Sequence, residues 1–198
     1  MKQLGSFLKS ISLTLLLVLV LHTTGMLSAV SVHAQSLLLR TGLLNADPEP
    51  STPEYFPYEF NLKTIEGKTI RMDSLKGKVV FLNLWATWCG PCRAEMPAIQ
   101  KLYASVPNEN MAFVMLSIDK KGSEAKVKKY LQDQGFTFPV FRPTYAGENS
   151  LPEMLKVPSI PTTFVINKEG YVVYKNVGTA NYNTKKFREF LRDLLAKE

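Results

Sequence analysis

The chain has 198 residues, enough for one domain with additional segments, and carries a net charge of +7 at pH 7. Its basic residues form no cluster interleaved with aromatic residues, so we do not expect nucleic-acid binding. A structural zinc site normally needs four Cys or His ligands. The chain has two cysteines and two histidines, and His22 and His33 lie in a segment that we expect to be removed, so we expect no metal.

The N-terminus has the pattern of an export signal. Two lysines precede an apolar core over Ile11–Leu21, which is too short to span a bilayer comfortably. Small and polar residues follow, and we expect cleavage after Ala34, with residues 1–34 as a signal peptide. The remaining chain would then be exported to the periplasm or the cell envelope. The alternative is an uncleaved membrane anchor over Ile11–Val30, which polar residues interrupt.

Residues 35–54 are rich in proline. Three prolines within Asp47–Pro53 exclude a helix or a central strand, so this segment is a linker or an arm that lies on the surface. The domain proper is predicted over residues 55–198. Near its start, Tyr58–Leu62 and Lys68–Met72 flank a turn and predict a hairpin.

The centre of the domain is predicted around two cysteines. The apolar run Val79–Ala86 indicates a strand buried on both faces. The residues Trp-Cys-Gly-Pro-Cys, positions 88–92, follow directly. After them, apolar or Cys side chains recur at spacings of three and four residues, which indicates one face of a helix. These side chains are Cys92, Met96, Ile99, Tyr103 and Val106. We therefore expect both cysteines where a buried strand meets a helix N-terminus.

That position favours redox chemistry. Unpaired N–H groups and the helix dipole stabilise a thiolate, which is the nucleophile of disulfide exchange. Cys89 should be the more exposed and attack first, and Cys92, one turn later, should resolve the mixed disulfide. Pro91 stiffens the first turn, and Gly90 leaves room for a partner chain. The alternative is a structural disulfide, but a bridge across four residues stabilises by only about 2 kcal/mol.

The second half of the domain predicts alternating strands and helices. The expected elements are strands over Ala112–Ile118, Phe138–Arg142, Thr163–Ile166 and Tyr171–Val177, a helix over Glu124–Gln134, and a last helix from Asn183 or Thr184. The strand Val79–Ala86, the helix that begins at Cys92 and the strand Ala112–Ile118 form a βαβ unit with parallel pairing. Residues 143–158 are an insertion, which serves packing or selects a partner. Pro161 opens a strand, and its peptide bond is trans by default.

Residues 82–97, LNLWATWCGPCRAEMP, resemble the TlpA/ResA group of exported thioredoxin-like proteins. The resemblance extends from about Tyr55 to the C-terminus. It implies an α/β thioredoxin-like fold, with a central mixed sheet flanked by helices, an N-terminal strand extension and an insertion before a cis-proline loop. It also implies that Pro161 is cis and lies against the cysteine pair. The expected substrate-contacting residues are Trp88, Gly90, Pro91, Ile160 and Pro161.

The resemblance also identifies a candidate acid–base residue. Thioredoxins have a buried Asp that helps take the proton of the second cysteine, and this chain has Asn83 at the matching place. Asn cannot act as a base. Glu95 lies three residues after Cys92 on the same helix face, and ResA-like proteins carry Glu at this spacing. Partial burial would raise its pKa and let it exchange a proton with Cys92. The alternative is an exposed Glu that favours the helix N-terminus.

We therefore expect an exported thiol–disulfide oxidoreductase in which Cys89, Cys92 and Glu95 are catalytic and which reduces disulfides in client proteins. Apart from the redox-active disulfide, we expect no cofactor. The resemblance implies a membrane thiol electron donor and a role such as cytochrome c biogenesis. Two other functions stay open, a disulfide-forming oxidant and a non-catalytic peptide-binding adaptor. We do not expect a peroxidase, because no Pro-x-x-x-Thr-x-x-Cys pattern precedes Cys89.

Overall fold

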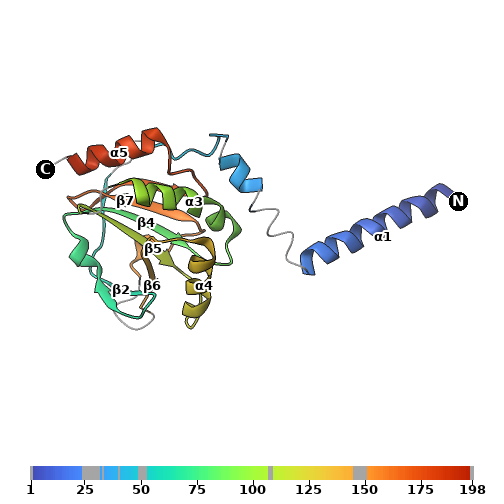
Figure 1. Cartoon of the computed structure of the whole chain (residues 1–198), viewed down its shortest axis with the longest axis horizontal. Coiled ribbons are helices and arrows are strands. Elements are labelled where there is room, and N and C mark those ends of the chain that lie inside the picture. The colour runs from blue at the N-terminus through green and yellow to red at the C-terminus, as the bar shows by residue number, and fades with distance from the viewer. Residues whose placement is uncertain are drawn as a thin grey trace.

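The computed structural model describes residues 2–23, 32, 34–39, 41–48, 53–106, 109–144 and 151–196. Helix α1 (Lys2–Thr23) extends away from the rest of the molecule (Figure 1). The side chains of residues 11–20 are exposed. Within the described ranges, no helix is long and apolar enough to qualify as a membrane span. The predicted cleavage motif includes His33, which lies outside the described residues, so the signal peptide stays a prediction.

Among the described residues, the centre of the molecule is a mixed sheet of eight strands in the order β1-β8-β7-β4-β5-β6-β2-β3. Strand β4 (Val79–Trp85) is buried along its whole length, as its continuous apolar sequence predicts. It pairs in parallel with β5 (Met111–Ser117) and antiparallel with β7 (Thr162–Ile166). The parallel pairing across the intervening helix confirms the predicted βαβ unit.

The remaining strands complete the two sides of the sheet. They are β1 (Glu54–Tyr55), β2 (Asn61–Thr64), β3 (Thr69–Arg71), β6 (Val140–Pro143) and β8 (Tyr171–Val177). Strands β2 and β3 form the predicted antiparallel hairpin, and Gly67 in its turn has a φ of +96°, which glycine adopts without strain. Because β2 also pairs with β6, the N-terminal strand extension belongs to the main sheet.

Within the part of the chain that the structure describes, three helices pack on one face of the sheet. They are α3 (Gly90–Ser105), α4 (Glu124–Gln134) and α5 (Lys185–Ala196). Their apolar side chains share a core cluster with Phe81 and Trp85 of β4, and Figure 1 shows α3 and α5 lying over β4 and β7. The expected mixed sheet flanked by helices is therefore confirmed.

The opposite face has a second core cluster. Leu82 and Leu84 of β4 point into it, and two short 3-10 helices, η1 (Met72–Leu75) and η3 (Glu153–Leu155), help to cover it. Helix η3 belongs to the predicted insertion and contributes the buried side chain of Leu155, so this part of the insertion serves packing. Residues 145–150 of the insertion lie outside the described residues.

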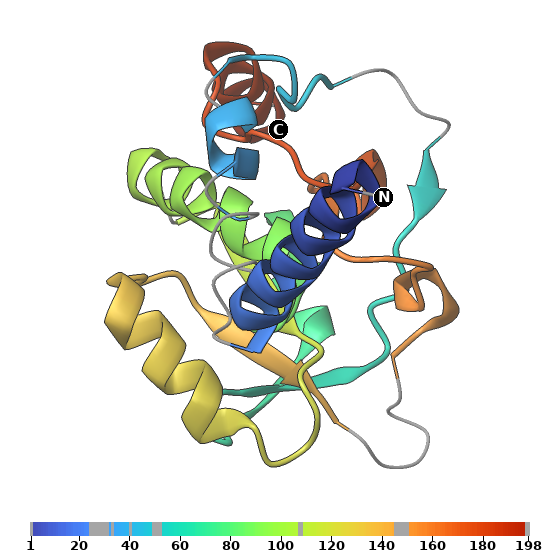
Figure 2. The ribbon, with the colours of Figure 1, turned by 90° about the vertical axis from the view of Figure 1, so that its right-hand side faces the viewer.

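An N-terminal strap, which we define as Leu39 together with residues 41–47, lies along the domain. The Ala46 N–H donates to the Asn181 carbonyl oxygen over 3.1 Å, and the Asn181 N–H donates to the Leu44 carbonyl oxygen over 2.7 Å. The side chains of Leu39 and Ala46 are buried. Figure 2 shows the short helix of residues 34–39, whose last residue belongs to the strap, between α3 and α5. Part of the predicted proline-rich linker is therefore packed on the domain.

Candidate active site

The two cysteines lie at the N-terminus of α3. Cys89 is the N-cap residue, Cys92 lies in the first turn, and the two form a disulfide with their Cα atoms 5.3 Å apart. The Cys92 N–H donates to Cys89 Sγ over 3.1 Å, so one of the unpaired donors of the helix terminus points at this sulfur. Cys89 is 5% exposed and Cys92 is fully buried. Cys89 is therefore the more accessible, and its surroundings favour a thiolate.

A tight turn carries the chain from β4 to the cysteines. The Cys89 N–H donates to the Ala86 carbonyl oxygen over 3.1 Å and closes this turn. Trp88 is 63% exposed, whereas Gly90 and Pro91 are half-buried. Trp88 thus offers a large apolar surface next to Cys89, where the sequence predicts contact with a substrate.

The loop before β7 lies against the disulfide. The peptide bond between Ile160 and Pro161 is cis, as the resemblance implied. The Ile160 carbonyl oxygen lies 3.8 Å from Cys89 Sγ, and the Pro161 carbonyl oxygen accepts a hydrogen bond from the Gly178 N–H over 2.8 Å. The structure therefore brings Ile160 and Pro161 together with the cysteines. Their contact with a substrate stays a prediction.

Glu95 is fully buried, which contradicts the alternative of an exposed side chain. Asn83 Nδ2 donates to Glu95 Oε1 over 2.8 Å, and the Ala180 N–H donates to Glu95 Oε2 over 3.2 Å. Burial raises the pKa of the Glu95 carboxyl to about 8, and the hydrogen bonds from Ala180 and Asn83 oppose this rise. The carboxyl can therefore take up or release a proton near neutral pH.

Sequence reasoning missed two polar groups of the site. Thr163 Oγ1 accepts a hydrogen bond from Asn83 Nδ2 over 2.9 Å, next to the bond that Asn83 donates to Glu95. Asp119 accepts two hydrogen bonds from Thr87, which lies between β4 and the cysteines. A signal for this second pair was present, because Thr87 and Asp119 each follow one of two neighbouring parallel strands, whose ends meet at one edge of the sheet.

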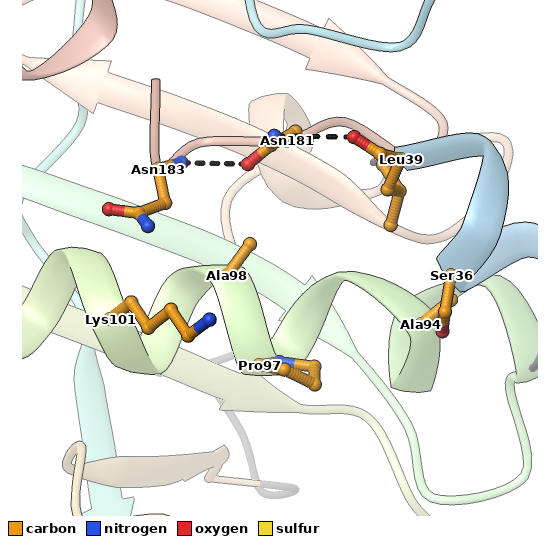
Figure 3. Close-up of a pocket in the computed structure, with 8 residues that line it drawn as sticks. All are labelled: Ser36, Leu39, Ala94, Pro97, Ala98, Lys101, Asn181 and Asn183. Atoms are coloured by element: carbon orange, nitrogen blue, oxygen red, sulfur yellow. Dashed lines mark hydrogen bonds between the residues drawn. The ribbon is translucent and has the colours of Figure 1, made fainter. Parts of the chain in front are cut away.

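No group of three His, Cys, Asp or Glu side chains in the described part of the chain is placed to hold a metal ion. A cavity of about 210 Å³ opens between residues 36–39 and α3 (Figure 3). It is lined by Ser36, Leu39, Ala94, Pro97, Ala98, Lys101, Asn181 and Asn183. The lining includes none of the predicted site residues, so the cavity is separate from the cysteine pair.

The chain is similar to a known protein family. The model of the AhpC/TSA family matches residues 55–175, more than half of the chain. The thioredoxin-like protein YneN of Bacillus subtilis is 34% identical over 136 residues, which cover 69% of this chain and 76% of that protein. The thiol-disulfide oxidoreductase ResA of Oceanobacillus iheyensis is 36% identical over 118 residues, which cover 58% of this chain. The match spans 59% of the length of that ResA, less than two thirds.

Solved structures show the same fold. StoA from Bacillus subtilis is 25% identical, with a TM-score of 0.52 over 74% of this chain and 99% of StoA. A thiol:disulfide interchange protein of the thioredoxin family from Chlorobium tepidum is 28% identical, with a TM-score of 0.54 over 77% of this chain and 99% of that one. The chain therefore belongs to the AhpC/TSA family, and its thioredoxin-like fold and its resemblance to ResA-type thiol–disulfide oxidoreductases are confirmed.

Proposed function

We propose that this protein is an exported thiol–disulfide oxidoreductase that reduces disulfides in client proteins. The observation that carries the proposal is the position of Cys89 as the N-cap of α3, where the Cys92 N–H donates to its sulfur over 3.1 Å. This arrangement favours the thiolate that begins disulfide exchange. The names of the relative ResA and of the similar thiol:disulfide interchange protein from Chlorobium tepidum support the same reaction class.

The exchange proceeds in two displacement steps. The Cys89 thiolate attacks one sulfur of the client disulfide, a bond forms between the two sulfurs, and the other client sulfur leaves as a thiolate. Cys92 then loses its proton and attacks Cys89 Sγ, and the second client sulfur leaves as a thiolate. The client gains two electrons, and the protein ends with the disulfide that the structure contains.

Glu95 is the proposed acceptor of the Cys92 proton. The group lies three residues after Cys92 in α3, it is fully buried, and its pKa is raised to about 8. A carboxylate of this basicity accepts a proton from a thiol more readily than an exposed carboxylate does. The proposed client surface lies around Cys89. It is formed by Trp88, by the turn at Gly90 and Pro91, and by the Ile160–Pro161 loop.

Export and the electron supply are also part of the proposal. The positively charged start, the short apolar core and the residues before position 35 support a cleaved signal peptide and a place in the periplasm or cell envelope. In an oxidising compartment the dithiol needs a dedicated reductant, so we propose a membrane thiol donor. Sequencing the N-terminus of the protein recovered from cells tests the cleavage after Ala34.

The reduction potential of the Cys89–Cys92 couple tests the direction of the reaction. A value near that of thioredoxin, about −270 mV, supports a reductant, and a value near about −120 mV identifies a disulfide-forming oxidant. The Cys92→Ser variant should accumulate a mixed disulfide between Cys89 and a disulfide-containing peptide. A protein that keeps its biological effect after both cysteines are changed to serine would instead be a peptide-binding adaptor.

A further inference from the structure

A buried carboxylate holds the turn that leads into the cysteines. Asp119 follows β5 and is 5% exposed. Thr87 occupies both oxygens of this carboxylate, because its N–H donates to Oδ2 over 2.9 Å and its hydroxyl donates to Oδ1 over 2.6 Å. The Ser117 hydroxyl also donates to Oδ2, over 2.8 Å. Burying a carboxylate is costly unless donors surround it, so this arrangement is a built feature of the fold.

Thr87, which donates these hydrogen bonds to Asp119, lies two residues before Cys89, whose sulfur attacks the client disulfide. The Cys89 N–H donates to the Ala86 carbonyl oxygen and closes a turn that contains Thr87 and Trp88. Trp88 is largely exposed, whereas Thr87 is buried, so Thr87 is the side chain that anchors this turn inside the protein. Its anchor, Asp119, lies two residues past the end of β5, and β5 pairs with β4 up to Trp85 and Ser117.

We propose that Asp119 is a positioning residue for disulfide exchange: by fixing Thr87, its carboxylate aims Cys89 and Trp88 at the client disulfide. This inference rests on the proposed function, since it needs Cys89 to attack a disulfide. Asp119 exchanges no proton or electron in the reaction. It acts because the attacking sulfur must approach the disulfide in line, and a displacement of about 1 Å can cost on the order of 100-fold in rate.

Four full-length variants separate this role from a general effect on stability. Asp119→Ala removes the acceptor, and Asp119→Asn keeps an oxygen for the Thr87 N–H. Thr87→Val removes only the hydroxyl donor, and Thr87→Ser retains it. Asp133→Ala, on the exposed face of α4, removes an acidic side chain far along the chain from the cysteines and is the control.

The readouts are kcat/KM for reduction of a disulfide-containing peptide, the rate at which Cys89 reacts with a small alkylating reagent, and the melting temperature. We expect kcat/KM to fall about tenfold or more in Asp119→Ala and about threefold or more in Thr87→Val. Asp119→Asn, Thr87→Ser and the control should stay within about threefold of the wild type, as should every alkylation rate. Loss of peptide reduction with retained alkylation identifies misplacement of a competent thiolate, which reduced stability alone would not produce.

The proposal is overturned if kcat/KM of Asp119→Ala stays within about threefold of the wild type, or if Asp119→Asn is as slow as Asp119→Ala. Should Asp119→Ala fail to fold, Thr87→Val against Thr87→Ser decides in the same way. Failure of the proposed function has a different signature. In that case the wild type reduces the peptide no faster than Cys89→Ser does.

Discussion

Two carboxylates, Glu95 and Asp119, are buried in the domain, and their surroundings suit them to different roles. Glu95 lies on α3 and accepts hydrogen bonds from Asn83 and from the Ala180 N–H. Asp119 lies after β5, and both of its oxygens accept hydrogen bonds from Thr87. The donors to Glu95 come from two distant segments, whereas Thr87 supplies two donors from a single residue. Glu95 is thus suited to bind a proton, and Asp119 is suited to fix the position of Thr87.

The balance between burial and donors explains the state of Glu95. Desolvation favours the neutral carboxyl, and hydrogen bonds donated to the carboxylate favour the charged form. For Glu95 desolvation is the larger effect, and the pKa rises from 4.5 to about 8. Glu95 can therefore carry a proton near neutral pH because its hydrogen-bond donors do not offset the effect of burial.

The largest expected effect concerns Glu95→Gln and the pH dependence of stability. Because the folded protein raises the Glu95 pKa from 4.5 to about 8, it binds this proton more tightly than the unfolded chain does. The resulting stabilisation is complete below about pH 4.5 and is lost as pH rises through about 8. Between these values, the unfolding free energy of the wild type should fall relative to Glu95→Gln by on the order of 5 kcal/mol.

Urea unfolding of the oxidised proteins at several pH values measures this difference. Glu169→Gln, at an exposed position, is the control and should follow the wild type at every pH. A constant difference between the wild type and Glu95→Gln from pH 4 to pH 9 would show that Glu95 does not carry a raised pKa, and the contrast with Asp119 would lose its basis.

The sequence predicted one of these two sites and not the other. Helix periodicity placed Glu95 on the same face of the helix as Cys92, and the family resemblance identified it as the candidate acid–base residue. No local sequence pattern predicts the hydrogen bond that the Ala180 N–H donates to Glu95, because the two residues are 85 positions apart. Thr87 and Asp119 lie 32 positions apart, and only the register of β4 against β5 brings them together.

The strap shows the same limit of sequence reasoning. The prolines within Asp47–Pro53 predicted a linker or arm for residues 35–54, but residues 34–39 form a short helix. However, the burial of Leu39 and Ala46 follows no periodic pattern, since it depends on the surface that α3 and the loop at Asn181 provide. Irregular segments reveal their contacts only through the tertiary structure.

A smaller effect is expected from Asn83→Leu, which removes one donor from Glu95. This hydrogen bond lowers the pKa of Glu95, so its loss should raise that pKa further, by about one unit, the equivalent of a hydrogen bond of about 1.4 kcal/mol. The pH midpoint of client release, or of the Glu95 carboxyl signal in NMR, measures the shift. Thr163→Val leaves the bond between Asn83 and Glu95 in place and is the matched control. An unchanged midpoint in Asn83→Leu would mean that Glu95 does not depend on this donor.

The smallest effect is expected from a substitution in the strap, which is linked to Glu95 only through Asn181 and Ala180. The strap is hydrogen-bonded to both backbone groups of Asn181, and the preceding residue, Ala180, donates to Glu95. Leu39 anchors the strap at the cavity beside Pro97 and Ala98 of α3 (Figure 3). The surroundings of Glu95 therefore include the strap, which precedes the matched family region. Thr87 and Asp119 both lie within that region.

Leu39→Asp should loosen the strap, because it places a charge at a buried position. Water then gains access to Glu95, and since burial is the main cause of its raised pKa, the pH midpoint of client release should fall, by roughly half a unit. Leu43→Asp makes the same change at an exposed strap position and should leave the midpoint unchanged. Hydrogen exchange at the Ala180 N–H reports the loosening independently. Faster exchange with an unchanged pH midpoint would show that the strap stabilises the loop at Ala180 and Asn181 but does not exclude water from Glu95.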